Sequence, residues 1–445
     1  MIPNAYRSSG PLTPKTGERF GTLGGVAGSL LLAVRVCLIV VLLAGIAWNV
    51  RAAIADQLAS RDTPAALRLA MRLDTANPAY PAQLAWALQV TDPPIAQTLL
   101  RRAVRLNPYD SSAWISLGLL EEERGDIAQA EADLLRAAAV DVTWMPSWSL
   151  ANFYYRRQRW DAFWLWAQKA AQIVPDDATP LLQLAWYVTP SETEIQYRLR
   201  IRQPEVQRQF LGFLITQGDA AGVADWGNRA LSPPAVASPE DVLSACEWLI
   251  QHKHPDLALP LWNGLAVRHQ IPFPSLEPGS GDSVTNGGFT RQPLSRGFDW
   301  RMTNPDGVTT YLNADPPAFD FEFSGRESES TLLLSEVVPV LPEKSYTLFI
   351  QDASSDIPPR SGLELVAAET ASGQVLARTT GFADSDQQSE VCFTTPPGVR
   401  FLTLMLDYQR QLGTVPLEGR IAIQKISLLP GPGVACDALP GAQQN

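Results

Sequence analysis

Residues Asn107 to Thr143, NPYDSSAWISLGLLEEERGDIAQAEADLLRAAAVDVT, contain the pattern that decides the fold of the chain around them. Bulky and small residues recur there at helical spacing, in two groups: Trp114, Leu117 and Gly118, then Ala130, Leu134 and Ala137. Gly125-Asp126 separates the two groups and is typical of a turn between helices. The small residues at positions 118 and 130 allow two helices to approach closely, so the stretch predicts an antiparallel helix pair.

Weaker copies of this pair lie on both sides of it. Three residues keep the register of the second group 34 residues earlier: Ala96, Leu100 and Ala103. Pro108 and Pro175 are 67 residues apart, about two such periods. The pattern resembles the tetratricopeptide repeat, which implies an all-α solenoid over residues 51–270 with atypical terminal copies. An ordinary helix pair is the alternative interpretation.

The first helix of each tetratricopeptide unit lines a concave face that binds protein partners. Carried onto this chain, the resemblance implies partner-groove residues in two successive units: Ser112, Ile115, Leu119, Glu122, Trp148, Asn152, Tyr155 and Arg156. Aromatic and arginine side chains in a groove are typical of binding hot spots. The alternative for Trp148 and Tyr155 is packing between helices.

An apolar run, LLLAVRVCLIVVLLAGIAWNV from Leu30 to Val50, precedes the repeats. It has about the 20 residues needed to cross a hydrocarbon core, and Trp48 suits a membrane interface. We expect a flexible cytoplasmic tail over residues 1–22 and a transmembrane anchor over residues 23–50. The protein would then be a single-pass protein of the inner (plasma) membrane, with its soluble domains outside the cytoplasm. A cleaved signal peptide is the alternative.

Helical spacing stops at Ile271, where a linker rich in Pro, Gly and Ser is expected over residues 271–282. Strand-like runs separated by turn residues follow over residues 283–429, at Phe319–Phe323, Thr331–Val340, Ser345–Gln351, Leu363–Ala368, Glu390–Thr395, Phe401–Tyr408 and Arg420–Leu429. This spacing predicts an antiparallel all-β jelly-roll sandwich. Residues 430–445 are expected to be a disordered tail.

The opening of the sandwich, Asn286-Gly287-Gly288-Phe289, and its closing strand, Gly419 to Ile426, resemble those of galactose-binding-like jelly rolls, which include many carbohydrate-binding modules. The resemblance implies a possible glycan-binding site with an aromatic platform and polar neighbours. The candidate residues are Asp299, Trp300, Arg301 and Tyr311. The alternative for Trp300 is burial under the sheet.

Charge, cysteine spacing and motifs limit the function. The net charge is -11, and residues 276–445 carry 11 basic and 21 acidic side chains, which argues against nucleic acid. Cys392 and Cys436 could form a disulfide in an oxidising compartment. No metal-ligand spacing, cofactor motif or catalytic motif occurs, so we expect no metal, no cofactor and no enzyme activity.

These features together predict a multidomain, membrane-anchored scaffold of the cell envelope. The repeats would bind protein partners, and the sandwich would contact glycan or another subunit, in a role such as surface polysaccharide assembly or export. The alternative is a carbohydrate-binding receptor in which the helical repeats serve as a spacer. A glycan-active enzyme with an accessory sandwich is a third, weaker interpretation.

Overall fold

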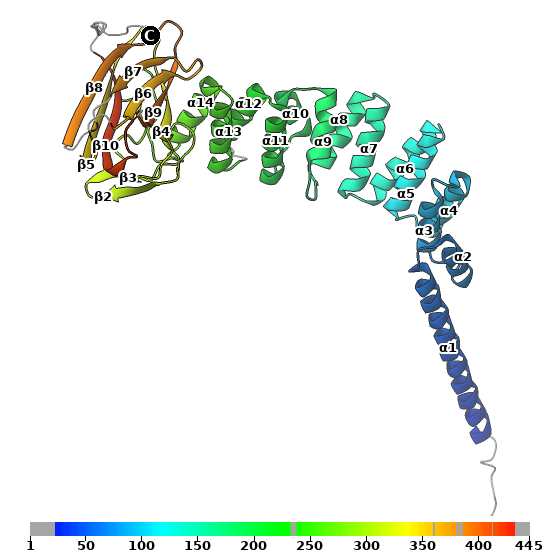
Figure 1. Cartoon of the computed structure of the whole chain (residues 1–445). Coiled ribbons are helices and arrows are strands. Elements are labelled where there is room, and N and C mark those ends of the chain that lie inside the picture. The colour runs from blue at the N-terminus through cyan, green and yellow to red at the C-terminus, as the bar shows by residue number, and fades with distance from the viewer. Residues whose placement is uncertain are drawn as a thin grey trace, which may run out of the picture. The chain divides into compact units, whose positions relative to one another are not determined.

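The structure is a computed structural model that describes residues 23–431 except 233–236, 359–360, 380–381, 383–385 and 412. Along the described chain, helices α1–α14 precede strands β1–β10 (Figure 1). The contacts divide the chain into two units, residues 1–150 and 151–445, which are described in turn. The expected tail over residues 1–22 and all but the first two residues of the expected C-terminal tail lie outside the described residues.

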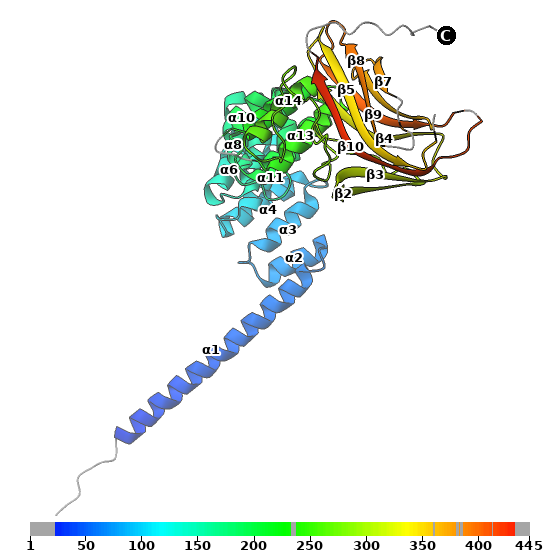
Figure 2. The same ribbon diagram turned by 90° about the vertical axis from the view of Figure 1, so that its left-hand side faces the viewer.

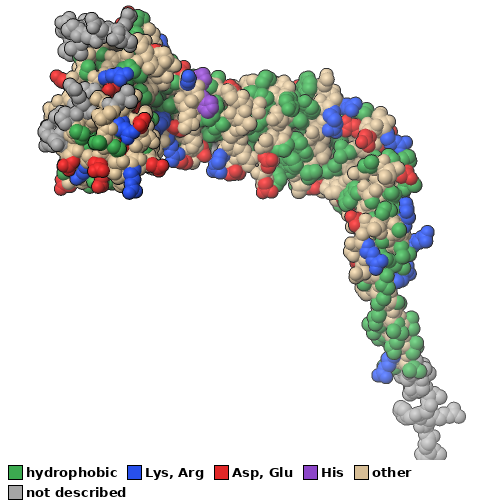
Figure 3. Space-filling model, in the orientation of Figure 1, with side chains coloured by type: hydrophobic (Ala, Val, Ile, Leu, Met, Phe, Trp, Pro, Cys, Tyr) green, Lys and Arg blue, Asp and Glu red, His purple; other side chains and the backbone are tan. Residues whose placement is uncertain are grey.

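Helix α1, Leu23–Ala59, opens the first unit and runs without a break across residue 50, where the anchor was expected to end. It contains one stretch, Leu31–Ala59, that is long and apolar enough to cross a membrane, and the side chains of residues 31–51 are exposed (Figure 3). Ala55 and Ala59, by contrast, are buried in the core of the helices that follow. The same helix therefore contributes an exposed apolar segment and part of the core of the first unit.

Five further helices complete this unit: α2 (Pro64–Leu73), α3 (Ala79–Leu88), α4 (Pro93–Leu106), α5 (Ser111–Glu123) and α6 (Ile127–Val140). Four of them begin at a side chain that accepts a backbone N–H of the first turn: Thr63, Asp92, Asp110 and Asp126. Such caps satisfy donors that the helix itself leaves free. α1 packs on α2, α3 on α4 and α5 on α6, which are the helical hairpins of a repeat array.

The pair α5–α6 shows why the quoted stretch contains its glycine. A Cβ at Gly118 would lie 2.8 Å from Cγ of Leu134 and 3.1 Å from the carbonyl oxygen of Ala130. Ala130, Leu134 and Ala137 are fully buried against this surface. The predicted close approach of the two helices is therefore confirmed.

Helix α7, Trp144–Arg156, crosses the division between the units, and seven helices follow it in the second unit. They are α8 (Trp160–Ala171), α9 (Thr179–Val188), α10 (Glu192–Leu199), α11 (Pro204–Gln217), α12 (Ala220–Ala230), α13 (Pro239–Gln251) and α14 (Pro255–Val267). The sequence did not predict α10. Its buried Glu192 forms a bidentate ion pair with Arg229 of α12, so α10 and α12 are linked through a charged pair.

Two five-stranded antiparallel sheets form the sandwich, with strand orders β1-β4-β9-β6-β7 and β2-β3-β10-β5-β8 (Figure 2). The strands are β1 (Arg301–Met302), β2 (Val308–Ala314), β3 (Pro317–Ser324), β4 (Ser330–Pro339), β5 (Ser345–Ser355), β6 (Leu363–Glu369), β7 (Val375–Thr379), β8 (Asp386–Thr394), β9 (Phe401–Gln409) and β10 (Glu418–Pro430). Side chains from both sheets fill one core between them. The predicted all-α repeats followed by an all-β jelly-roll sandwich are confirmed.

The Asn-Gly-Gly-Phe opening joins the start of the sandwich to its last strand. Gly287 accepts the backbone N–H of Ile426 in β10 at 2.8 Å, and a Cβ at Gly287 would lie 2.0 Å from the carbonyl oxygen of Ile426. Phe289 is fully buried in the core. The motif is thus explained by close backbone contact and by packing.

The expected linker over residues 271–282 is a packed connection within the second unit. Ile271, Phe273 and Leu276 are buried, and Phe273 stacks on Trp262 of α14. Asn263 of α14 exchanges two hydrogen bonds with the backbone of Leu276, at 3.0 and 2.8 Å. The connection is therefore packed and hydrogen-bonded against α14.

Candidate interaction surfaces

In the first unit, α5 presents part of the predicted partner groove. Ser112 is exposed, Leu119 is 42% exposed, and Glu122 is half-buried. Ile115 is only 8% exposed and does not line a surface groove, so its assignment is corrected. The repeat positions transferred from the resemblance therefore identify an exposed face, with one of the four side chains turned inward.

A tryptophan that the sequence prediction did not include lies beside this face. Trp86 of α3 is 44% exposed and donates its indole N–H to Oγ of Ser116 at 2.9 Å. Ser116 and Leu119 are three residues apart and share a face of α5. We call Trp86, Ser116 and Leu119 the α3–α5 strip. Trp86 was missed because the repeat positions were carried only onto the two best-preserved units.

The remaining predicted groove residues belong to α7. The Trp148 ring stacks on Trp144 with centroids 5.1 Å apart, and it is half-buried. In the second unit, Asn152 and Tyr155 are half-buried and Arg156 is exposed. Tyr155 contacts the rings of Trp160 and Phe163, so it contributes to packing between α7 and α8 as the alternative interpretation expected.

Two buried carboxyl groups face each other inside the α5–α6 pair. Glu121 of α5 is fully buried and accepts hydrogen bonds from Gln97 at 3.2 Å and from Arg101 at 2.8 Å. Burial raises the pKa of Asp133 of α6 to about 7, and the neighbouring charge of Glu121 adds to this rise. Asp133 also bonds Gln129 at 3.0 Å and shares a hydrogen bond with Glu121. At pH 7 the carboxyl group of Asp133 is therefore about half protonated.

In the sandwich, two of the four candidate glycan-binding residues are buried. Asp299 and Trp300 have no exposed surface, and the ring of Trp300 packs near Phe289. Asp299 accepts the backbone N–H groups of Leu294 at 2.6 Å and Trp300 at 2.8 Å, so it holds the opening loop together. Neither side chain can contact a ligand on this surface, and both assignments are corrected.

Arg301 contacts the helical repeats. Its guanidinium donates to Glu247 of α13 at 2.6 and 3.2 Å, and Glu247 also accepts the backbone N–H of Gly297 at 2.7 Å. A second ion pair joins Arg296 to Glu240 on the same helix. Arg301 is therefore a structural contact between the repeats and the sandwich.

Tyr311 is the predicted glycan residue that lies on the surface, with 41% of its area exposed. Arg420 lies over its ring at 5.8 Å and forms an ion pair with the buried Asp320 at 2.8 Å. The strand register places Tyr311, Arg420, Gln351 and Phe349 on the outer face of one sheet. Phe349 is half-buried, and Lys425 lies over its ring at 5.9 Å.

We call Tyr311, Phe349, Gln351, Arg420 and Lys425 the outer-face cluster. It combines aromatic rings with cations and an amide, which are the groups that a sugar-binding surface needs. The sequence prediction missed four of its members because it considered only residues near the opening motif. Alternation along β5 was a signal for Phe349 and Gln351. Arg420 and Lys425 are five residues apart and share a face only because the register of β10 shifts between Ile423 and Lys425.

Of the cysteines, Cys392 in β8 is disulfide-bonded, whereas Cys37 and Cys246 are free thiols. Cys436, the partner expected from the sequence, lies outside the described residues. Within the described part of the chain, no group of three or more His, Cys, Asp or Glu side chains could hold a metal ion. The expected absence of metal, cofactor and catalytic activity stays a prediction.

No protein-family model matches the sequence, and no curated protein matches it. Solved structures similar to the chain include MamA, with 18% identity, a TM-score of 0.25 and coverage of 35% of this chain and 95% of MamA. They also include a CBM4 structure, with 11% identity, a TM-score of 0.27 and coverage of 34% and 100%. A third is the carbohydrate binding module CBM6cm-2 from Cellvibrio mixtus lichenase 5A, with 12% identity, a TM-score of 0.20 and coverage of 29% and 90%.

These values carry no functional inference, and the fold assignment rests on the helices and strands themselves. The described helices form hairpins at the period predicted for tetratricopeptide-like repeats. The described strands form two antiparallel sheets around one core. The chain therefore combines a helical-repeat architecture, for which MamA is a structural neighbour, with a sandwich, for which CBM4 and CBM6cm-2 are structural neighbours.

Proposed function

We propose that the protein is a membrane-anchored interaction scaffold of the cell envelope. The continuity of α1 is the observation that carries this proposal. Its exposed apolar segment leads directly into Ala55 and Ala59, which are buried in the core of the first helices. A signal peptide that is removed does not need to be one helix with the domain core, so the continuity favours an uncleaved anchor.

The disulfide of Cys392 supports an extracytoplasmic position for the sandwich, because disulfides persist mainly in oxidising compartments. Two assays test this proposal. Membranes are extracted at alkaline pH, and, in a separate sample, intact spheroplasts are treated with protease. We expect the protein to stay in the membrane fraction and its C-terminal part to be digested from outside. Release into the soluble fraction would refute the anchor, and protection from protease would refute the orientation.

The α3–α5 strip supports a protein partner, because an exposed tryptophan beside an exposed leucine is typical of an interface hot spot. The test is a photocrosslinking residue at Leu119, with Leu135 of α6, which is 39% exposed, as the matched control. We expect one defined adduct from position 119 and none from position 135. Trp86→Ala should then weaken binding of the captured partner at least about tenfold, since hot-spot truncation costs about 2 kcal/mol. Equal labelling at both positions would refute the assignment.

The outer-face cluster favours glycan binding as a second function, and a role in surface polysaccharide assembly or export is proposed on this basis. Aromatic faces stack on sugar rings while polar side chains bond hydroxyl groups. The full chain in detergent should bind glycans on an array, and Tyr311→Ala should reduce this binding at least about fivefold. Trp300→Phe, a change in the core, is the control that leaves binding unchanged. If no glycan binds, the second function fails and the scaffold proposal remains.

We also propose that the protein is not an enzyme and does not bind nucleic acid. The acidic C-terminal half supports the second statement, since it repels phosphates. Incubation of the full chain with the glycans that it binds should leave their length unchanged, as measured by chromatography. Shortened products, or retention of the chain on single-stranded DNA at low salt, would contradict these proposals.

A further inference from the structure

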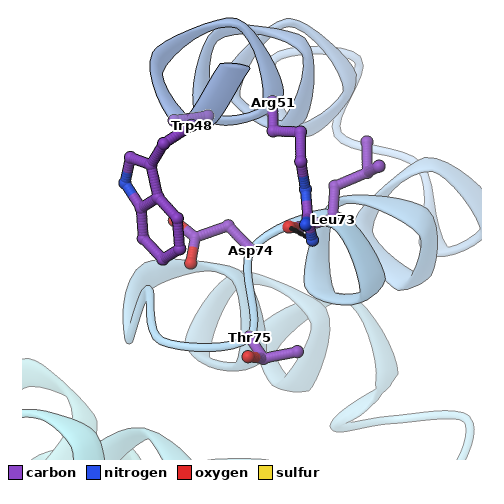
Figure 4. A pocket seen from close by; sticks show the side chains of 6 residues that line it. Trp48, Arg51, Leu73, Asp74 and Thr75 are labelled. Atoms are coloured by element: carbon purple, nitrogen blue, oxygen red, sulfur yellow. Dashed lines mark hydrogen bonds between the residues drawn. The ribbon is translucent and has the colours of Figure 1, made fainter. Parts of the chain in front are cut away.

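A small hollow lies where α1 meets the end of α2 in the first unit. It is lined by Trp48, Arg51, Ala52, Leu73, Asp74 and Thr75 and has a volume of about 50 Å³ (Figure 4). One wall is α1, and the other is the short segment that connects α2 to α3. Nothing in the interactions described above uses this hollow.

Hydrogen bonds fix the shape of the hollow. Arg51 donates to the carbonyl oxygen of Leu73 at 2.6 Å, and Arg102 of α4 donates to that of Thr75 at 3.0 Å. The carboxylate of Asp74 accepts the backbone N–H of Ala76 at 3.1 Å. Tyr80 of α3 donates to Asp56 of α1 at 2.5 Å, so α1 cannot swing away from the connecting segment without breaking this bond as well.

The two sides of the hollow carry opposite charges. Figure 4 shows Arg51 reaching down to Leu73 on one side, while Asp74 and the ring of Trp48 lie on the other. Among the described residues, Leu73 is the acceptor bonded to the Arg51 guanidinium, which leaves other N–H groups for a phosphate. A carboxylate beside an aromatic ring is a suitable site for an ammonium group. A ligand that carries both a phosphate and an amine therefore matches both sides.

The position of the hollow indicates where such a ligand comes from. Val36 to Trp48 has no polar side chain, and Trp48 is 63% exposed at the end of this run. Arg51 follows three residues later, about 4.5 Å further along the helix axis. On the proposed membrane anchoring, on which this inference rests, the hollow lies at the level of lipid headgroups.

We propose that this hollow binds the headgroup of an amine-bearing phospholipid, phosphoethanolamine, from the leaflet in which the apolar segment of α1 ends. The phosphate contacts Arg51, and the ammonium lies between Asp74 and the face of Trp48. The charge of residues 51–106 favours a position next to lipid phosphates. This segment contains seven arginines and four aspartates, whereas the whole chain has a net charge of -11. An acidic lipid without an amine, such as phosphatidylglycerol, satisfies Arg51 but offers no cation to the carboxylate of Asp74.

Native mass spectrometry of the full chain in detergent tests the proposal, with lipids added at known concentrations. We expect phosphatidylethanolamine to bind at least fivefold more tightly than phosphatidylglycerol. Asp74→Asn, whose amide oxygen still accepts from Ala76, should remove this preference without weakening phosphatidylglycerol. Arg51→Gln should weaken both lipids, and Arg51→Lys should restore part of the binding. Arg61→Gln, an exposed arginine beyond the hollow, is the matched control that changes neither lipid.

Three outcomes would overturn the proposal. The first is equal or weaker binding of phosphatidylethanolamine, and the second is a preference that survives Asp74→Asn. The third is free O-phosphoethanolamine binding as tightly as the lipid, which would remove the membrane as the source of the ligand. Alkaline extraction of the wild-type chain separates failure of the headgroup site from failure of the anchor. If the chain stays in the membrane but shows no lipid preference, the headgroup site is refuted and the anchor is not.

Discussion

The carboxyl pair inside α5–α6 predicts that this helix pair becomes less stable as the pH rises towards neutrality. Glu121 accepts hydrogen bonds from Arg101 and Gln97. Asp133 lies opposite Glu121 and accepts a hydrogen bond from Gln129 on its own helix. Replacing Asp133 by Asn keeps a group of the same shape that can donate to Glu121 at every pH. The substitution therefore removes the titration and retains the hydrogen bond.

The magnitude follows from the two pKa values of Asp133. Its ordinary pKa is 3.8 and its pKa in the folded protein is about 7, so the folded state holds a proton that the unfolded state has released over the range between them. Stability contributed by this group is complete below pH 4 and declines as the pH rises to 7. Integration between pH 5 and 7 gives a loss of about 2 kcal/mol in the wild-type protein. Asp133→Asn should show none of this loss.

Hydrogen–deuterium exchange of peptides from α5 and α6 measures the free energy of opening of this pair, once the pH dependence of intrinsic exchange is removed. We expect the wild-type opening free energy to fall between pH 5 and 7 and that of Asp133→Asn to stay level. Glu123→Gln, which changes an exposed carboxyl group on the same helix, is the control and should retain the wild-type slope. If Asp133→Asn and the wild type fall in parallel, burial does not raise the pKa of Asp133 as described.

Two other substitutions test the packing of the repeats and their junction with the sandwich. Gly118→Ala places a methyl group against Leu134 and should destabilise the α5–α6 pair by about 1–3 kcal/mol, seen as faster exchange of both helices. Glu247→Ala leaves Arg301 without its carboxylate and should cost about 2 kcal/mol, measured as increased exchange of α13 and of the segment at residues 296–301. Unchanged exchange in either experiment would show that the contact does not limit local opening.

The sequence predicted the repeats well because their signals are local. Helix starts at Asp92, Asp110 and Asp126 and the close contact of Gly118 all depend on residues within one repeat. Gly212 stands in the same Leu-Gly context as Gly118, but a Cβ there would meet no atom within 4 Å. The Leu-Gly pair alone therefore does not predict a close contact between helices.

The sandwich shows the opposite limit. The predicted strands are those with apolar side chains on their core face, whereas β1, β2 and β7 were missed. All three are edge strands in which fewer side chains are buried, so their hydrophobic alternation is weak. Trp300 was a candidate ligand residue because of its type, but its burial depends on Phe289 and other core residues that are distant in sequence. The exposure of an aromatic ring in a sandwich therefore cannot be predicted from the residues next to it in the sequence.

The continuity of α1 limits where a partner of the repeats can lie. An anchor joined by a flexible linker gives a domain a wide volume to search, with an effective concentration set by linker length. Here the exposed apolar segment and the buried Ala55 belong to one helix. Ala55 lies only about 10 Å along the helix axis from Trp48. On the proposed anchoring, the first helix pairs stay within one or two helix diameters of the headgroups and cannot turn away. The α3–α5 strip therefore suits a partner that is itself held at the membrane surface, because a partner in free solution gains nothing from this fixed position.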